Sequence, residues 1–285
     1  MEGATDRFTR VESRASSSSS RYPGRYARAV SRTGAARKYR HVLTDPVAFC
    51  ALVGFLIVAG LGLDRFASLG WQHVLGACTW AVLLATCTVL TPDERAMVTV
   101  VVVVATIAEV IGSILWKVYE YRLGNLPLFV PAGHGLVYLS GLRITQMPAV
   151  RRHPARLLGL AIGGAILWGV LGLTVLERSD VAGAMGVATL VGFILWGRAP
   201  LLYSGVFLTV AALEIYGTWV GTWRWAAEIP GLGLSDGNPP SGAASGYILF
   251  DICALALAPF VLSAVRASRR MGLRASQPPM ESDPT

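Results

Sequence analysis

Long apolar stretches dominate this sequence, and several of them are long enough to cross a lipid bilayer. A helix that spans the hydrocarbon core needs about 20 mostly apolar residues. Such stretches lie at roughly 46–63, 71–90, 96–116, 157–176, 198–219 and 243–266. Two weaker, Gly-rich stretches lie at 127–142 and 182–197. We therefore predict an all-α membrane protein with about eight transmembrane helices, or six such helices with two re-entrant segments.

Lysine and arginine residues are distributed unevenly among the predicted loops. With eight spans, 20 of the 25 fall on the side that holds both chain ends, and five fall on the other side. Cytoplasmic loops of membrane proteins carry such an excess of positive charge. We therefore expect a multi-pass protein of the cytoplasmic (inner) membrane with both termini in the cytoplasm.

The positive charge also divides the chain into regions. Residues 1–44 include ten lysines and arginines and a run of five serines, which predicts a disordered basic cytoplasmic tail. Contact with anionic membrane lipids is the favoured role of this tail, and nucleic-acid binding is the weaker alternative. We assign 45–145 to a first four-helix half, 146–266 to a second half, and 267–285 to a cytoplasmic C-terminal tail.

Two segments of the chain resemble each other in order and composition. EVIG at 109–112 and EIYG at 214–217 are each followed by an aromatic–charged–aromatic triplet, YEY at 119–121 and WRW at 223–225. Beyond the triplets, the segments that begin at Leu123 and Asp236 align without a gap. An even number of spans in each copy predicts a parallel four-plus-four internal duplication.

Acidic residues and one histidine lie inside these apolar stretches, in the part that we place in the outer half of the bilayer. A charged carboxylate at that depth costs several kcal/mol unless it is protonated or paired. A protonated acid beside an ionised base suits general acid–base chemistry or proton-coupled movement. The structural alternative is that each acid only locks neighbouring helices together. The candidate catalytic residues are Glu109, Glu214, Asp251 and His134.

Aromatic and amide side chains surround these candidates in the repeated segments and adjoining loops. Rings at this level anchor a protein in the membrane interface, and a dense group of them can line the access path of an amphiphile. No second ligand stands at helical spacing from the histidine, so we expect no metal site, and the cofactor requirement stays unknown. The candidate substrate-binding residues are Trp116, Tyr119, Tyr121, Asn125, Tyr138, Trp223, Trp225, Asn238 and Tyr247.

One part of the pattern resembles a known family. A Glu-x-x-Gly motif, an aromatic-x-aromatic pair, a glycine and a proline that opens the next span resemble the multi-pass membrane hydratases of carotenoid biosynthesis. The residues that carry this resemblance are Glu109, Gly112, Tyr119, Tyr121, Gly124 and Pro131. The resemblance implies an isoprenoid-like ligand, and the Ala/Gly/Val/Arg-rich composition is similar to that of actinobacterial proteins.

These observations lead to one main hypothesis and two alternatives. The main hypothesis is a protein that binds or modifies a lipid-like or isoprenoid-like molecule in an outward-facing cavity lined by paired acids. The first alternative is a transporter or proton-coupled exporter that uses the same acids. The second is a non-catalytic subunit of an envelope complex, with a protein partner in addition to membrane lipids.

Overall fold

The computed structural model describes residues 39–275, with side-chain surroundings as far as Ser268. Most of the predicted basic tail, and the last ten residues of the predicted C-terminal tail, lie outside the described residues. From Leu43 onward the chain is one unit, in which helices from the two predicted halves pack against each other. The predicted halves are therefore not separate bodies.

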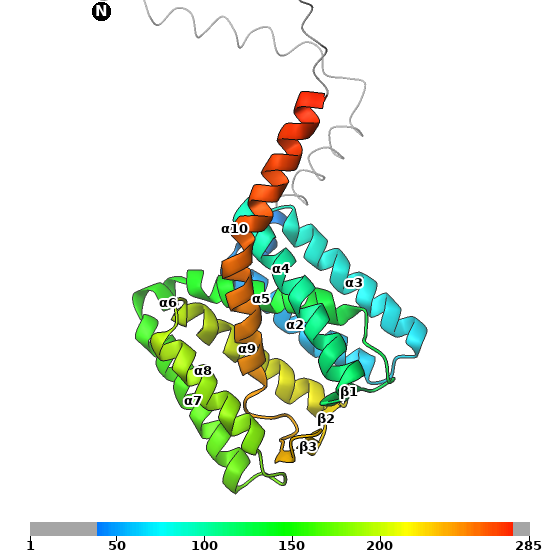
Figure 1. The fold of residues 1–285 in the computed structure, drawn as a ribbon, viewed down its shortest axis with the longest axis vertical. Helices are drawn as coiled ribbons and strands as arrows, with labels where there is room; N and C mark the ends of the chain where they lie inside the picture. Colours follow the sequence, from blue (N-terminus) through cyan, green and yellow to red (C-terminus); the bar gives the residue numbers. More distant parts are fainter. Residues whose placement is uncertain (1–38, 276–285) are drawn as a thin grey trace, which may run out of the picture. The chain divides into compact units, whose positions relative to one another are not determined.

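Eight helices of 16 residues or more run through the described part of the chain (Figure 1). They are α2 (Pro46–Asp64), α3 (Leu69–Cys87), α4 (Pro92–Glu109), α5 (Phe129–Gln146), α7 (Pro154–Thr174), α8 (Val181–Trp196), α9 (Pro200–Val220) and α10 (Ala243–Ala275). A π-helix, η2 (Val110–Leu115), continues α4, and α6 (Pro148–Arg152) is a short helix after α5. Helix α10 continues nine residues beyond 266, where we expected the C-terminal tail to begin.

Five of these helices are long and apolar enough to cross a membrane: α2, α4 with η2, α7, α9 and α10. Many large apolar side chains on them are exposed, such as Phe55, Val103 and Phe260. Such a surface is stable against lipid and unstable against water. The prediction of a mostly helical protein is confirmed, and five helices that could cross a membrane agree with the predicted multi-pass membrane protein. The number of spans remains a prediction.

Proline marks the start of five helices: α2, α4, α6, α7 and α9. Proline suits the first helical position because its missing N–H group would have no partner there and its φ angle is already helical. Helix α4 also has a capping box, in which Thr91 and Glu94 satisfy each other's backbone N–H groups. These local signals explain why the helix boundaries lie close to the predicted ones.

Two short antiparallel ribbons connect the helices at one end. Strand β1 (Tyr119–Tyr121) pairs with β2 (Trp223–Trp225), and β3 (Glu228–Ile229) pairs with β4 (Leu234–Ser235). The β1–β2 pair joins segments about a hundred residues apart in the chain, and neither segment was predicted to be a strand. Its alternation of aromatic and charged residues is typical of a strand with one covered face.

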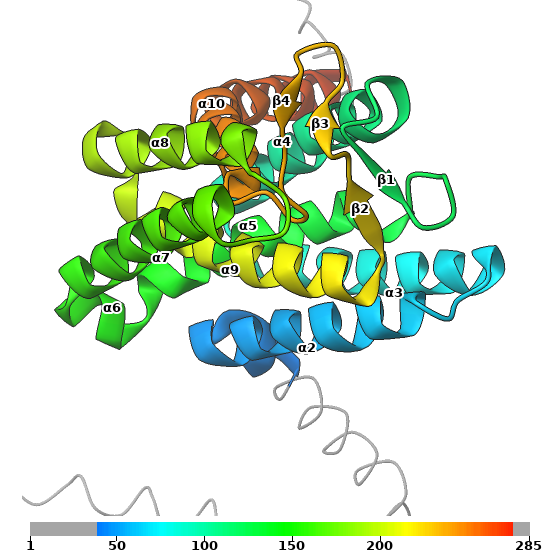
Figure 2. The same ribbon diagram turned by 90° about the horizontal axis from the view of Figure 1, so that it is seen from below.

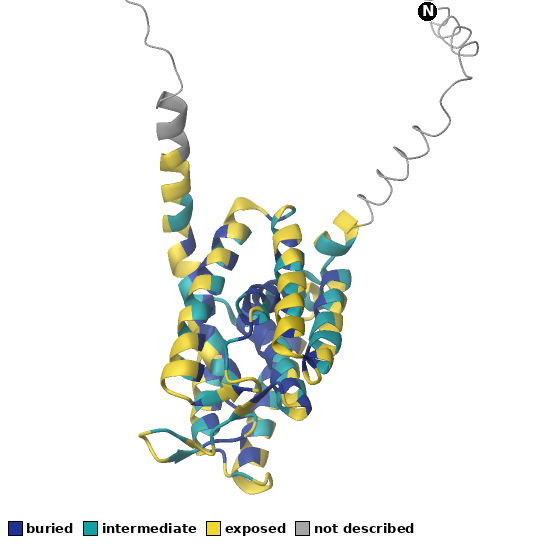
Figure 3. Cartoon of the chain, turned by 90° about the vertical axis from the view of Figure 1, so that its right-hand side faces the viewer, coloured by how far each residue is buried: buried dark blue, intermediate teal, exposed yellow. Residues whose placement is uncertain are grey.

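Helix α5 is enclosed by other helices. It packs against α2, α3, α4 and α9, and more than half of its residues are buried. In Figure 2 it runs behind α9, and Figure 3 shows the buried residues concentrated in the interior. Glycines allow the close contacts: a Cβ on Gly141 would lie 2.9 Å from the backbone nitrogen of Val206 on α9. The weak hydropathy of this stretch therefore reflects contact with protein instead of lipid.

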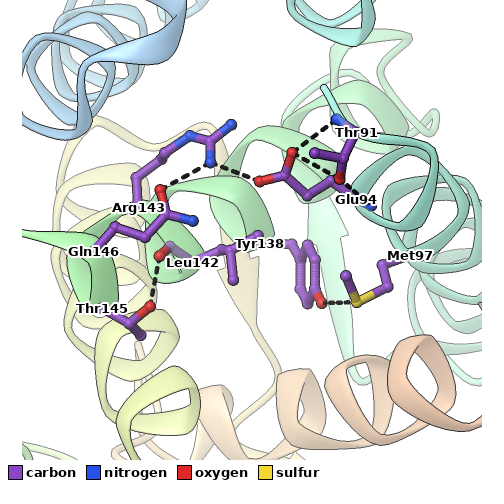
Figure 4. Close-up of polar contacts among 8 residues, drawn as sticks. All are labelled: Thr91, Glu94, Met97, Tyr138, Leu142, Arg143, Thr145 and Gln146. Carbon is purple, nitrogen blue, oxygen red and sulfur yellow. Dashed lines mark hydrogen bonds and ion pairs between the residues drawn. The ribbon is translucent and has the colours of Figure 1, made fainter. Parts of the chain in front are cut away.

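The first turn of α4 is tied to the last turn of α5 by an ion pair (Figure 4). Nη1 of Arg143 donates to Oε1 of Glu94 at 2.7 Å and to Oε1 of Gln146 at 2.9 Å. One level further in, the hydroxyl of Tyr138 donates to Sδ of Met97 at 3.1 Å. Arg143 is only 6% exposed and is therefore buried inside the bundle. Its charge is neutralised by Glu94 at this end of the bundle.

The crossing of α5 and α9 provides a test of the packing. Gly205→Ala would place a Cβ 2.8 Å from the Gly141 carbonyl oxygen, so we expect a loss of about 1–3 kcal/mol in unfolding free energy. Gly163→Ala in α7 is the matched control, because a Cβ there meets nothing within 4 Å. It should leave stability unchanged or raise it slightly. Thermal unfolding in detergent measures both, and equal effects would contradict the close crossing.

Candidate functional site

One cavity of about 450 Å³ lies among the helices, and both Glu109 and Glu214 line it. Its wall is formed by α2, α3, α4 with η2, α5, α9 and α10, together with the β1–β2 ribbon. The volume lies within the range of about 300–1,000 Å³ that holds small ligands in proteins. Most of the lining side chains are apolar, so the few polar groups on the wall determine what the cavity can bind.

Glu109 is buried at the end of α4, and both of its carboxylate oxygens have partners. Oε2 accepts hydrogen bonds from the hydroxyls of Tyr119 at 2.9 Å and Tyr121 at 2.8 Å. Oε1 lies 2.8 Å from Nε2 of His134, so the carboxylate and the imidazole share a proton. Burial, reinforced by the Glu109 charge, raises the pKa of both tyrosines above the ordinary range. Both hydroxyls therefore stay protonated and act as donors.

Glu214 is equally buried on α9, but only one of its oxygens has partners. Oε2 accepts hydrogen bonds from the indole Nε1 atoms of Trp223 at 2.9 Å and Trp225 at 3.1 Å. An indole N–H can only donate, so Oε2 must be the unprotonated oxygen. Within the described part of the chain nothing hydrogen-bonds Oε1, and the residue lines the cavity. Oε1 of Glu214 is thus the carboxyl oxygen that a ligand can reach.

A glycine three positions after each glutamate makes room for the ring that binds it. A Cβ on Gly112 would lie 3.1 Å from the Tyr119 ring, and a Cβ on Gly217 would collide with the Trp223 ring. The Glu-x-x-Gly and aromatic-x-aromatic patterns are therefore parts of one arrangement, in which the glycine admits the ring and the ring donates to the carboxylate.

The β1–β2 ribbon places the four aromatic donors beside the two acids. Tyr119 lies opposite Trp225 and Tyr121 opposite Trp223, with ring centroids 4.6 Å and 6.1 Å apart. Oδ1 of Asn238 accepts a hydrogen bond from the Trp225 backbone at 3.0 Å and holds this edge in place. The ribbon is therefore a rigid cover over the acidic end of the cavity.

His134 packs on two rings from α10. Its centroid lies 5.0 Å from that of Tyr247 and 5.4 Å from that of Phe250, and all three residues line the cavity. Nδ1 of His134 is buried, with no hydrogen-bond partner among the described residues. The imidazole is thus held through Nε2 alone, by Glu109, and its orientation depends on that carboxylate.

The cavity brings together nine of the thirteen predicted site residues. They are Glu109, Trp116, Tyr119, Tyr121, His134, Glu214, Trp223, Trp225 and Tyr247. Trp116 is held by a hydrogen bond from its Nε1 to the Pro230 carbonyl of the β3–β4 turn, at 2.9 Å. This turn had no role in the sequence prediction.

The other four predicted residues do not line the cavity. Asp251 is 1% exposed on α10, and its Oδ2 has no partner in the described part. Tyr138 is tied to Met97, as described above. Asn125 donates to Oε1 of Gln72 at 2.8 Å, and Asn238 supports the ribbon. The repeated asparagines therefore have structural contacts, because each one fixes a loop.

Two buried polar groups outside the cavity were missed by the sequence reasoning. Asp64, at the end of α2, accepts from Nε2 of Gln72 at 2.9 Å and lies 3.8 Å from Nε of Arg122. Asp180, which caps α8, accepts from the backbone of Gly237 and from the backbone and hydroxyl of Ser241. An acid at a helix end was the available signal, because such residues often cap helices or fix loops.

The comparisons with known proteins give no relative. No protein-family model, no curated protein and no solved structure matches the chain. Among the described residues, no group of three or more His, Cys, Asp or Glu side chains is arranged to hold a metal ion. The site must therefore be interpreted from its own geometry.

The loop beside Asp180 makes stability depend on pH through Asp236. Burial, and then the Asp180 charge, raises the pKa of Asp236 from its ordinary value of 3.8 to about 7. The stability that the protonated form contributes is complete below about pH 4 and is lost as the pH rises through about 7. We expect Asp236→Asn to unfold at a higher temperature than wild type at pH 8, by at least about 2 °C, and this difference to shrink steadily as the pH falls to about 4. A difference between the two proteins that does not change with pH would contradict this assignment.

Proposed function

We propose that this protein binds a lipid-like or isoprenoid-like molecule in the cavity and that the paired acids position or protonate it. The observation that carries the proposal is the pairing of Glu109 and Glu214 on the wall of one mostly apolar cavity. An apolar wall binds a hydrocarbon chain, and a small number of convergent polar groups fixes its orientation.

The two acids have different hydrogen bonds and therefore different proposed roles. Glu109 accepts from two hydroxyls and shares a proton with His134, which suits an ionised carboxylate that acts as a base or orients the imidazole. Glu214 presents Oε1 to the cavity and suits a neutral acid that gives its proton to a ligand double bond or hydroxyl. Because two ionised carboxylates on one apolar wall repel each other, we expect only one of Glu109 and Glu214 to be ionised at a time.

We also propose that the site was built by duplication, as the sequence predicts. Each glutamate is held by the aromatic pair of its own copy. The antiparallel pairing of β1 with β2 fits a local two-fold axis between the copies. In this relation α4 corresponds to α9 and α5 to α10, and the α4–α10 contact has its counterpart in the α9–α5 contact. Glu109 and Tyr119 are ten positions apart, whereas Glu214 and Trp223 are nine apart. The π-helix η2 takes up the extra residue. Helices α2 and α7 have different neighbours, so the relation weakens at the first helix of each half.

The charge asymmetry supports the proposed orientation, with eight spans, both termini in the cytoplasm and the ribbon on the outer side.

Asp251 supports the transport alternative, because a buried acid without a described hydrogen bond, one turn from Tyr247, could carry a proton further along α10. If the protein is a transporter, deleting its gene should change how a lipid is distributed between compartments. If it binds or modifies the lipid, deletion should change the chemical composition of the lipids.

The test is lipid analysis of a deletion strain complemented with variants. We expect wild type to restore the lipid profile and Glu214→Gln to fail, because a neutral amide cannot supply a proton. The expected loss of conversion is at least about 100-fold, the usual contribution of a general acid. Glu109→Gln should fail too, because it loses the charge that holds His134.

Glu120→Gln is the matched control, because this exposed glutamate lies on β1, opposite Arg224 and away from the cavity lining. It should complement fully. Complementation by both Glu109→Gln and Glu214→Gln would show that the acids have no chemical role.

A further inference from the structure

Helix α3 and the end of α4 both line the cavity without packing extensively on each other, and we interpret the space between them as an opening. These helices are consecutive and are joined by residues 88–91, yet in the described part α3 packs mainly on α2 and α5, and α4 packs on α5 and α10. They approach each other over Gly135 of α5, where a Cβ would lie about 3.1–3.2 Å from both Val102 and Leu83.

Both edges of this opening line the cavity. Leu75, Cys78 and Thr79 belong to the α3 edge, and Ala108, Ile111 and Gly112 to the edge formed by α4 and η2. Cys78 is exposed and Ile111 is 47% exposed, so the edges are accessible from outside. The neighbouring exposed side chains on both helices are also apolar, for example Val74 and Ile107. Such a rim faces hydrocarbon, because it would be unfavourable against water.

The equivalent place in the second half is closed. Helix α8 packs on α9 as well as on α10, whereas α3 and α4 make no extensive contact in the described part of the chain. At the acidic end, the paired rings of the β1–β2 ribbon cover the cavity. The least obstructed path into the cavity therefore leads sideways, from the bilayer.

The wall also limits the charge of the ligand. Among the described residues that line the cavity none is lysine or arginine, and the one histidine is paired with Glu109. A phosphate group would approach two carboxylates without a counter-charge and would be repelled in a medium of low dielectric constant. A hydroxyl or a double bond carries no such penalty and can meet Oε1 of Glu214. A cavity of about 450 Å³ is also too small for two long acyl chains.

We infer that the cavity takes an uncharged lipid with a single chain, of the prenol class, directly from the bilayer through the opening between α3 and η2. This inference rests on the proposed function and adds the charge class of the ligand and its route. It excludes phosphorylated isoprenoids and phospholipids as ligands.

The test uses the full chain in lipid nanodiscs, with a photoactivatable prenol and its monophosphate as probes. Cross-linked peptides are mapped by mass spectrometry. We expect the prenol to label cavity-lining peptides and the monophosphate to label them at least about tenfold less, which corresponds to about 1.4 kcal/mol. Cys78→Trp and Ile111→Trp fill the two edges of the opening and should slow prenol labelling by about tenfold.

Matched controls are Leu84→Trp on α3 and Val103→Trp on α4, because both native side chains are exposed and neither lines the cavity. They should label as wild type does. If neither the prenol nor the monophosphate labels the cavity, the proposed function itself is overturned. Labelling that is unchanged in the filled variants, or equal for prenol and monophosphate, would overturn only the present inference. If a filled variant does not fold, the comparison of the two probes on wild type still decides the charge class.

Discussion

Two carboxyl groups placed among apolar helices must find hydrogen-bond donors, and the acidic end of the cavity is built around that requirement. The free-energy cost of burying a carboxylate without hydrogen-bond partners is much larger than the stabilisation that one helix–helix contact provides. Glu109 obtains two hydroxyls and an imidazole, and Glu214 obtains two indoles. These donors arrive on the β1–β2 ribbon and on α5, so the glutamates, the glycines beside them and the ribbon act as one unit.

This unit leaves one polar atom available. Because an indole can donate and never accept, Trp223 and Trp225 fix one oxygen of Glu214 and leave the other to the cavity. Had tyrosines stood at these positions, as they do beside Glu109, their hydroxyls could also accept a hydrogen bond from a protonated carboxyl oxygen. The difference between the two aromatic pairs therefore gives chemically distinct acids within similar surroundings, which is the condition for acid–base work.

Helix packing determines how a ligand reaches this atom. Helix α5 forms the floor of the cavity, and its glycines allow close contact with α9 on one side and with Leu83 and Val102 on the other. In the inferred route, the ligand enters between α3 and α4 at the level of η2. A π-helix widens the backbone locally and is frequent at functional sites. Because η2 follows Glu109 directly and ends shortly before β1, the acid, the inferred opening and the ribbon lie next to one another along the chain.

Helix positions were predictable because they depend on local chemistry: long apolar runs, proline at the first turn and polar residues at the caps. The repeated glutamates and aromatic triplets were also visible, because they follow one another in the same order in both segments. The β1–β2 ribbon was not predicted, since its two strands are about a hundred residues apart and each has only three residues. For the same reason, the contacts of Asn125 with Gln72 and of Asp180 with Ser241 could not be read from spacing.

The sequence alone determined the class of protein and the inventory of the site: apolar helices that suit a membrane, and acids and rings that are costly to bury singly. Tertiary structure decided which of them meet. It brought both glutamates to one cavity and left Asp251 and Tyr138 outside its wall. These two residues lie one helical turn after Tyr247 and His134, and at that level the helix contacts other helices instead of the cavity. The opening between α3 and η2 likewise depends on how far two helices diverge, a property of packing that no local residue pattern contains.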